Sequence, residues 1–317
     1  QGNGYTTDFI RPLSLYLVKQ RSAASAGENK DPARIKERHP DLANPPVYPV
    51  VLAGWMKVYQ WLFQAADAAR GFLPDFIQSK LPSFNLEMEN PVWQKEKHFW
   101  WSPHDFMIAL FNEALFFLVI GLTFFLTRRL FDPGVAWLSS LLLLGSELLW
   151  RFSASGLSTM LLMLIFVGLA WCLVLVEAGM REPQGGGGRL FLLAAGAGCL
   201  LGLGMLTRYS FGWLILPVGT YLILFGGSRK GTLCLVTLAM FLLIVAPWIY
   251  RNVKVSGTSF GTTTFAVLEG SSAFPEHQLA RSLTPDFNRN FFSGVLPKLL
   301  GNGRTLLQNE LPRLGGS

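Results

Sequence analysis

The sequence of 317 residues has a net charge of +7, with 50% apolar and only 15% charged residues. Its apolar residues gather in runs, such as the uncharged residues 233–245. A hydrocarbon core of about 30 Å takes about 20 helical residues to cross, so such runs argue against a soluble all-helical protein. No basic stripe is interleaved with aromatic residues, which argues against nucleic-acid binding. We therefore expect an all-α integral membrane protein.

Residues 1–104 are polar and rich in proline and aromatic side chains, with one strongly apolar stretch at 47–65. Lys57 and Gln60 interrupt this stretch. We predict a helix that lies in the membrane interface rather than one that crosses the membrane.

A transmembrane domain of six helices is predicted over residues 105–250. The expected spans are 106–127, 134–150, 157–178, 190–206, 211–226 and 232–249.

Basic residues in alternate connections predict the orientation of these spans. Arg128 with Arg129, Arg181 with Arg189, and Arg229 with Lys230 mark three connections as cytoplasmic. Residues 1–104 and the tail 251–317 should then lie on the outer, periplasmic side of the cell's inner (plasma) membrane.

Small residues and cysteines in the spans indicate packing, not chemistry. Gly198 and Gly202 form a small-xxx-small face suited to close helix contact. Cys172, Cys199 and Cys234 all lie in apolar runs and predict neither a disulfide framework nor a metal site.

Three acidic residues are expected in the outer half of the membrane, where an ionisable group is a functional candidate. They are Asp105, Glu113 and Glu147. Glu147 could instead pair with Arg151 one turn later. Glu113 could make a structural hydrogen bond between helices or line a polar pathway.

Two arginines follow predicted outer ends of spans. Arg208 and Tyr209 occupy a short turn, and Arg251 and Asn252 follow the last span. A guanidinium fork suits phosphate oxygens, although an arginine at a helix end also commonly reaches toward lipid headgroups. We predict that these residues and the three acids converge on a lipid-linked phosphate.

Other chemistry is weakly indicated. Asp41, close to His39, could belong to an acid/base or metal pair, or cap a surface turn. No His/Cys cluster has metal-ligand spacing, and neither a phosphate-cradling loop nor a nucleophile elbow is found. We expect no cofactor, and a divalent metal is left open.

Five stretches, taken in order, resemble one family. They are "GNGYTTDFIRPLS", "NPPVYPVVLA", "TRRLFDPGVAWLSSLLLL", "GLGMLTRYSFGWLILP" and "APWIYRNVKVSGTSFGT". Their order and placement resemble the GT-C superfamily of membrane glycosyltransferases, specifically bacterial relatives of the dolichyl-phosphate-mannose protein mannosyltransferases (family 39-like).

This resemblance implies transfer of a sugar from a polyprenyl phosphate to a protein, lipid or glycan acceptor on the outer face. It implies that Arg208 and Arg251 stabilise the leaving lipid phosphate. The family's first span and its acidic motif should precede Gln1, so the general base is expected in sequence before this chain. Asp8 and Asp41 are the alternatives within this chain.

Two other functions stay open. The chain could be a non-catalytic membrane scaffold that packs against partner membrane subunits. A transporter that uses Glu113 and Glu147 as a proton path would predict internal repeats, which are not found between the two halves.

Overall fold

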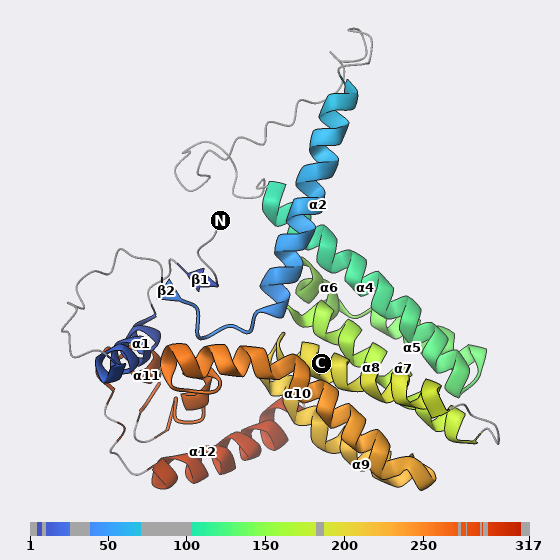
Figure 1. Ribbon diagram of the computed structural model, residues 1–317. Helices are drawn as coiled ribbons and strands as arrows, with labels where there is room; N and C mark the ends of the chain where they lie inside the picture. Colours follow the sequence, from blue (N-terminus) through green and yellow to red (C-terminus); the bar gives the residue numbers. More distant parts are fainter. Residues whose placement is uncertain are drawn as a thin grey trace. The chain divides into compact units, whose positions relative to one another are not determined.

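The computed structural model describes residues 5–7, 11–25, 39–70, 103–181, 187–271, 274–276, 278–285, 287 and 291–311. The chain forms two compact units. The central unit comprises residues 45–245, and the terminal unit joins residues 1–44 to residues 246–317. Helix α10 (Lys230–Ser256) begins in the central unit and ends in the terminal unit. The described residues are overwhelmingly helical, which confirms the predicted fold class (Figure 1).

The central unit is a bundle of apolar helices. In chain order its helical segments are α2 (Val47–Arg70), α4 (Pro103–Leu130), α5 (Pro133–Leu144), α6 (Glu147–Ala154), α7 (Thr159–Arg181), α8 (Gly187–Met205), η2 (Tyr209–Leu214), α9 (Ile215–Phe225), η3 (Gly227–Arg229) and the first part of α10. Helix α4 packs on α5 and α7, and α7 packs along α8 (Figure 1).

Four helices in the described residues are long and apolar enough to cross a membrane: α4, α7, α8 and α10. A fifth crossing is possible if α5 and α6 form one span, and the apolar segment Tyr209–Phe225 is shorter. The chain is thus a multi-pass membrane protein, as its composition predicts. That the protein has six spans stays a prediction.

The span predicted at 134–150 is wrong as a single helix. Helices α5 and α6 meet at an angle of 56°. Gly145 closes α5 through a 2.8 Å bond from its N–H to the Leu141 carbonyl, and Ser146 is extended, with φ −77° and ψ 105°. The Trp150 indole N–H then donates to the Leu144 carbonyl at 2.7 Å, so a side chain satisfies a backbone acceptor at the break.

Two other predicted spans have different boundaries. The segment predicted at 211–226 begins with the 3₁₀ helix η2 before it becomes α-helical. Helix α10 does not end at residue 249, as predicted, but continues to Ser256, so residues predicted to begin the outer tail are helical. The predicted interfacial stretch is the helix α2, which extends to Arg70 and is not among the span candidates.

Glycines bring α8 close to α10, which confirms the predicted packing face. A Cβ added to Gly202 would lie 2.7 Å from the Cβ of Ile244, and one added to Gly198 would clash with the Thr237 carbonyl. The Thr237 hydroxyl donates to the Ala194 carbonyl at 3.1 Å across the same contact. Only a residue without a Cβ allows two helix backbones to approach this closely.

The terminal unit combines the first described residues with the last. Its elements are β1 (Thr6–Thr7), α1 (Pro12–Ser25), β2 (His39–Pro40), the end of α10, η4 (Gly261–Phe265), α11 (Gln278–Arg281), α12 (Phe291–Thr305) and the π-helical turn η5 (Leu306–Glu310). The short strands β1 and β2 pair antiparallel, with Thr6 opposite Pro40.

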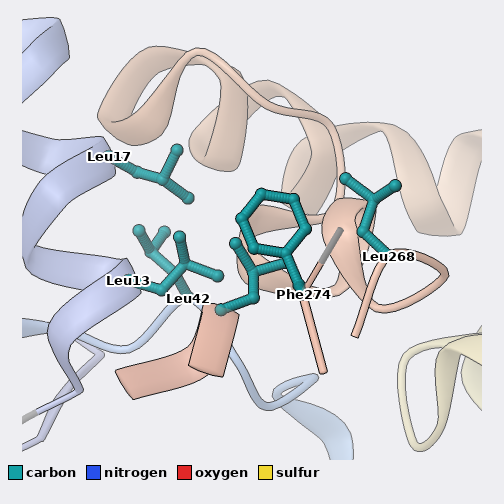
Figure 2. Close-up of a cluster of buried hydrophobic side chains, with 6 residues drawn as sticks. Leu13, Leu17, Leu42, Leu268 and Phe274 are labelled. Carbon is teal, nitrogen blue, oxygen red and sulfur yellow. The ribbon is translucent and has the colours of Figure 1, made fainter. Parts of the chain in front are cut away.

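A small hydrophobic core holds this unit together. Figure 2 shows its buried side chains, which come from both ends of the chain: Leu13, Leu17, Leu42, Leu268, Phe274 and Leu279. Gly261 has φ +57°, and a Cβ there would clash with the Leu42 carbonyl. That carbonyl also accepts the Thr262 N–H at 3.2 Å, so the glycine permits a backbone contact that joins the two ends.

Candidate functional site

The turn after α8 places Arg208 at the start of η2. Its N–H donates to the Gly204 carbonyl at 2.8 Å, and its own carbonyl accepts the Phe211 N–H at 2.9 Å. A Cβ at Gly204 would clash with the Phe211 ring, and one at Gly212 would lie 2.8 Å from the Met205 sulfur. The glycines of "GLGMLTRYSFGW" therefore allow a tight turn in which Arg208 is extended, with φ −153° and ψ 120°.

The Arg208 side chain is exposed. Its guanidinium makes no hydrogen bond or ion pair with any residue that the structure describes. Tyr209, also predicted at the site, is half-buried as the first residue of η2. An exposed guanidinium beside an apolar bundle can bind an anionic group without first breaking an existing bond.

An apolar groove of about 300 Å³ lies between η2 and the start of α7. Its lining residues are Thr159, Leu162, Met163, Phe166, Val167, Phe211 and Leu214. Phe211 follows Arg208 by three residues, so one short helix carries the cation at its start and part of the groove along its length. This combination suits an amphiphile with an anionic head and a hydrocarbon tail.

Arg251 has a very different environment in the terminal unit. Its guanidinium donates to the Asp41 carbonyl at 2.7 Å, the Tyr5 carbonyl at 3.0 Å and the Asn252 side-chain oxygen at 3.0 Å. It also lies 4.7 Å from the centroid of the Trp248 ring, which forms a T-shaped contact with the Tyr5 ring. Arg251 thus ties the first described residues of the chain to the end of α10.

Asn252 and Asp41 complete this network as structural groups. Asn252 is fully buried, and its amide donates to the Ser259 carbonyl at 3.3 Å. The Asp41 carboxylate accepts the Ala43 N–H at 2.9 Å and the Asn44 N–H at 3.2 Å. Asp41 therefore caps a turn, which is one of the two roles that its sequence context left open.

The three acids predicted to lie in the membrane have different surroundings. Asp105 is exposed in the first turn of α4, and Glu113 is half-buried further along the same helix. Glu147 forms the expected ion pair with Arg151, at 2.6 Å, with both side chains more than 70% exposed. Such a pair contributes little stability where water reaches it.

A polar junction that the sequence did not reveal joins α2 to α4. The Tyr48 hydroxyl donates to the Gly156 carbonyl at 2.7 Å, and the fully buried Asn112 amide donates to the Tyr48 oxygen at 3.0 Å. Burial raises the pKa of Tyr48, which keeps its hydroxyl protonated as a donor. Tyr48 lies in the quoted "NPPVYPVVLA", but only its placement against Asn112 shows this role.

A second polar junction lies near the C-terminal end of α7. The Tyr221 hydroxyl donates to the Glu177 carboxylate at 2.6 Å, and Arg181 pairs with the same carboxylate. Glu177 and Tyr221 thereby connect α7 to α9. The sequence signal was a lone acid near the end of an apolar run.

Two expectations have no structural outcome. Asp8 lies outside the described residues. The predicted convergence of Arg208 with Arg251 concerns both units and stays a prediction. Within the described ranges no group of three His, Cys, Asp or Glu side chains could hold a metal ion.

Comparison with known proteins points to one family. Residues 102–250 match the family model described as dolichyl-phosphate-mannose-protein mannosyltransferase. Residues 102–250, which include most of the candidate membrane spans, are similar to this family. The match extends from the start of α4 into α10 and includes Arg208, so the resemblance seen in the sequence motifs is confirmed and indicates a membrane glycosyltransferase. No curated protein and no solved structure matches the chain.

Proposed function

We propose that the protein transfers a sugar from a polyprenyl-phosphate donor to an acceptor on the outer face of the membrane. The observation that carries this proposal is the exposed Arg208 guanidinium at the start of η2. The same short helix lines the apolar groove together with α7. Such a donor has a phosphate for the cation and a hydrocarbon tail for the groove. The match to a mannosyltransferase family supports a lipid-linked sugar as donor.

The chemistry assigns Arg208 a specific task. The acceptor hydroxyl oxygen forms a bond to the anomeric carbon of the sugar, the bond from that carbon to the phosphate oxygen breaks, and a general base takes the hydroxyl proton. Negative charge then grows on the lipid phosphate. A cation placed against the developing charge stabilises the transition state more than the ground state. Arg251 and Asn252, whose contacts tie down the terminal unit, stay predictions as phosphate ligands.

Arg208→Ala tests this role in the full-length protein in membranes, supplied in turn with different polyprenyl-phosphate sugars. Loss of one charge-stabilising group at a reacting centre commonly lowers kcat by a factor of about 100 or more. We expect a loss of that size for the accepted donor, with unchanged membrane insertion.

Arg128→Ala is the matched control, because Arg128 is also an exposed arginine at a helix end but lies in the last turn of α4. It should transfer sugar normally. Unchanged transfer by Arg208→Ala would remove Arg208 from the site. A full-length protein that accepts no polyprenyl-phosphate sugar would favour the scaffold function instead.

A further inference from the structure

Helix α12 and the turn η5 expose two groups of leucines, one on each side of residues 301–305. These six side chains, the leucine face, are between 49% and 67% exposed: Leu296, Leu299, Leu300, Leu306, Leu307 and Leu311. Positions 296, 299, 300, 307 and 311 follow the spacing that places side chains on one side of a helix. No described part of the chain covers this face, and isolated exposed leucines would not show such spacing.

The opposite side of α12 packs against the rest of the terminal unit. The Lys298 ammonium donates to the carbonyls of Val267, at 3.0 Å, and of Glu269. Val295 packs against the hydrophobic core of the unit. Lys298 lies two residues from both Leu296 and Leu300, which is about 200° around a helix, so its bonds turn the leucine face outward.

The terminal unit also contains the end of a candidate membrane span. Residues 246–256 of α10 belong to this unit, and the span candidate runs to Ser256. Trp248, in this part of α10, is a residue type that gathers at membrane boundaries. A bilayer surface is therefore within reach of α12, whichever side of the membrane the unit occupies.

We propose that the leucine face lies in the bilayer surface, with α12 and η5 parallel to the membrane plane. The composition favours lipid over a protein partner, because the six exposed side chains are all aliphatic, whereas aromatic anchors are common in protein interfaces. The exposed Arg304, one turn after Leu300, can reach from this face to a lipid phosphate. The described residues 291–311 contain Lys298, Arg304 and one acid, Glu310. The resulting positive charge suits anionic lipid headgroups.

Site-directed spin labelling tests this placement in the full-length protein in lipid nanodiscs that contain phosphatidylglycerol. Single cysteines replace Leu296, Leu300 or Asn302 in a background whose other cysteines are serine. Asn302 is exposed and lies one turn after Lys298, so it is the matched control on the opposite side. For each label we compare the collision rate with oxygen to the collision rate with a water-soluble nickel complex. We expect this ratio to be at least about threefold higher at 296 and 300 than at 302.

Two outcomes would overturn the proposal. Equal access of the nickel complex at all three positions would place the leucine face in water. Low access of both quenchers at 296 and 300 would indicate a covering protein, and dipolar coupling between labels would identify that protein as a second copy. Size-exclusion elution like that of the unlabelled protein confirms that each labelled variant is folded.

Discussion

Arg208 and Arg251 follow apolar helical segments in the same kind of sequence context, yet their surroundings differ. The Arg208 guanidinium is exposed and makes no polar contact with the described part of the chain. The Arg251 guanidinium bonds two carbonyls and one amide oxygen and lies over the Trp248 ring. An arginine near the end of a span can therefore serve either as an available cation or as a structural clamp.

The difference follows from the polar groups that the fold places near each arginine. Among the described residues, Arg208 itself makes only local backbone bonds, with Gly204 and Phe211. The long-range bond in this turn, from the Val47 N–H to the Leu206 carbonyl at 2.9 Å, does not involve Arg208. The Arg251 segment meets carbonyls from residues more than 200 positions earlier in the chain. Buried carbonyls need donors, and a guanidinium supplies several in a fixed geometry.

Among substitutions in the terminal unit, which contains Arg251, Gly261→Ala should cause the largest loss of stability. The new Cβ would clash with the Leu42 carbonyl, and alanine is strained at φ +57°. We expect the free energy of unfolding to fall by about 3 kcal/mol. Thermal unfolding of the purified full-length protein, followed by tryptophan fluorescence, measures this change.

Gly257→Ala is the control for that substitution. Gly257 has φ +72° but no atom within 4 Å of its added Cβ, so only the backbone strain applies. Its cost should be about 1 kcal/mol. Equal effects at 257 and 261 would show that the contact with Leu42 does not hold the unit together.

Arg251→Lys should have an intermediate effect on the same network. An ammonium cannot bond the Asp41 and Tyr5 carbonyls and stack on Trp248 together, so the free energy of unfolding should fall by about 2 kcal/mol. Arg208→Lys, measured in the same assay, should leave stability unchanged. If the two lysine variants unfold alike, the contrast between the arginines is wrong.

Glu147→Gln should have the smallest effect. It removes an exposed ion pair with Arg151 and should change stability by less than about 0.5 kcal/mol, with sugar transfer unchanged. A loss of transfer without a loss of stability would return Glu147 to the candidate site. The measurements are the thermal unfolding curve and the donor assay used for Arg208→Ala.

The sequence alone predicted much of the helical architecture because composition and periodicity are local properties. It placed α4, α7, α8 and the start of α10, and the close packing at Gly198 and Gly202. It missed the break between α5 and α6, because apolar composition continues across Gly145 and Ser146. It also ended the last span at residue 249, because Pro247 removes one helical hydrogen bond and the sequence does not show whether other contacts maintain the helix beyond it.

For the candidate site, the sequence determined which residue types were available and the family that they resemble. Tertiary structure decided their roles. It bonded Arg251 to carbonyls more than 200 residues earlier, gave the side chains of Asn252 and Asp41 local hydrogen-bond partners, left Arg208 exposed, and brought Tyr48 to Asn112 and Gly156. The reason is physical: hydropathy sets where a helix can lie, but only the folded chain shows which polar groups are already satisfied and which can bind a substrate.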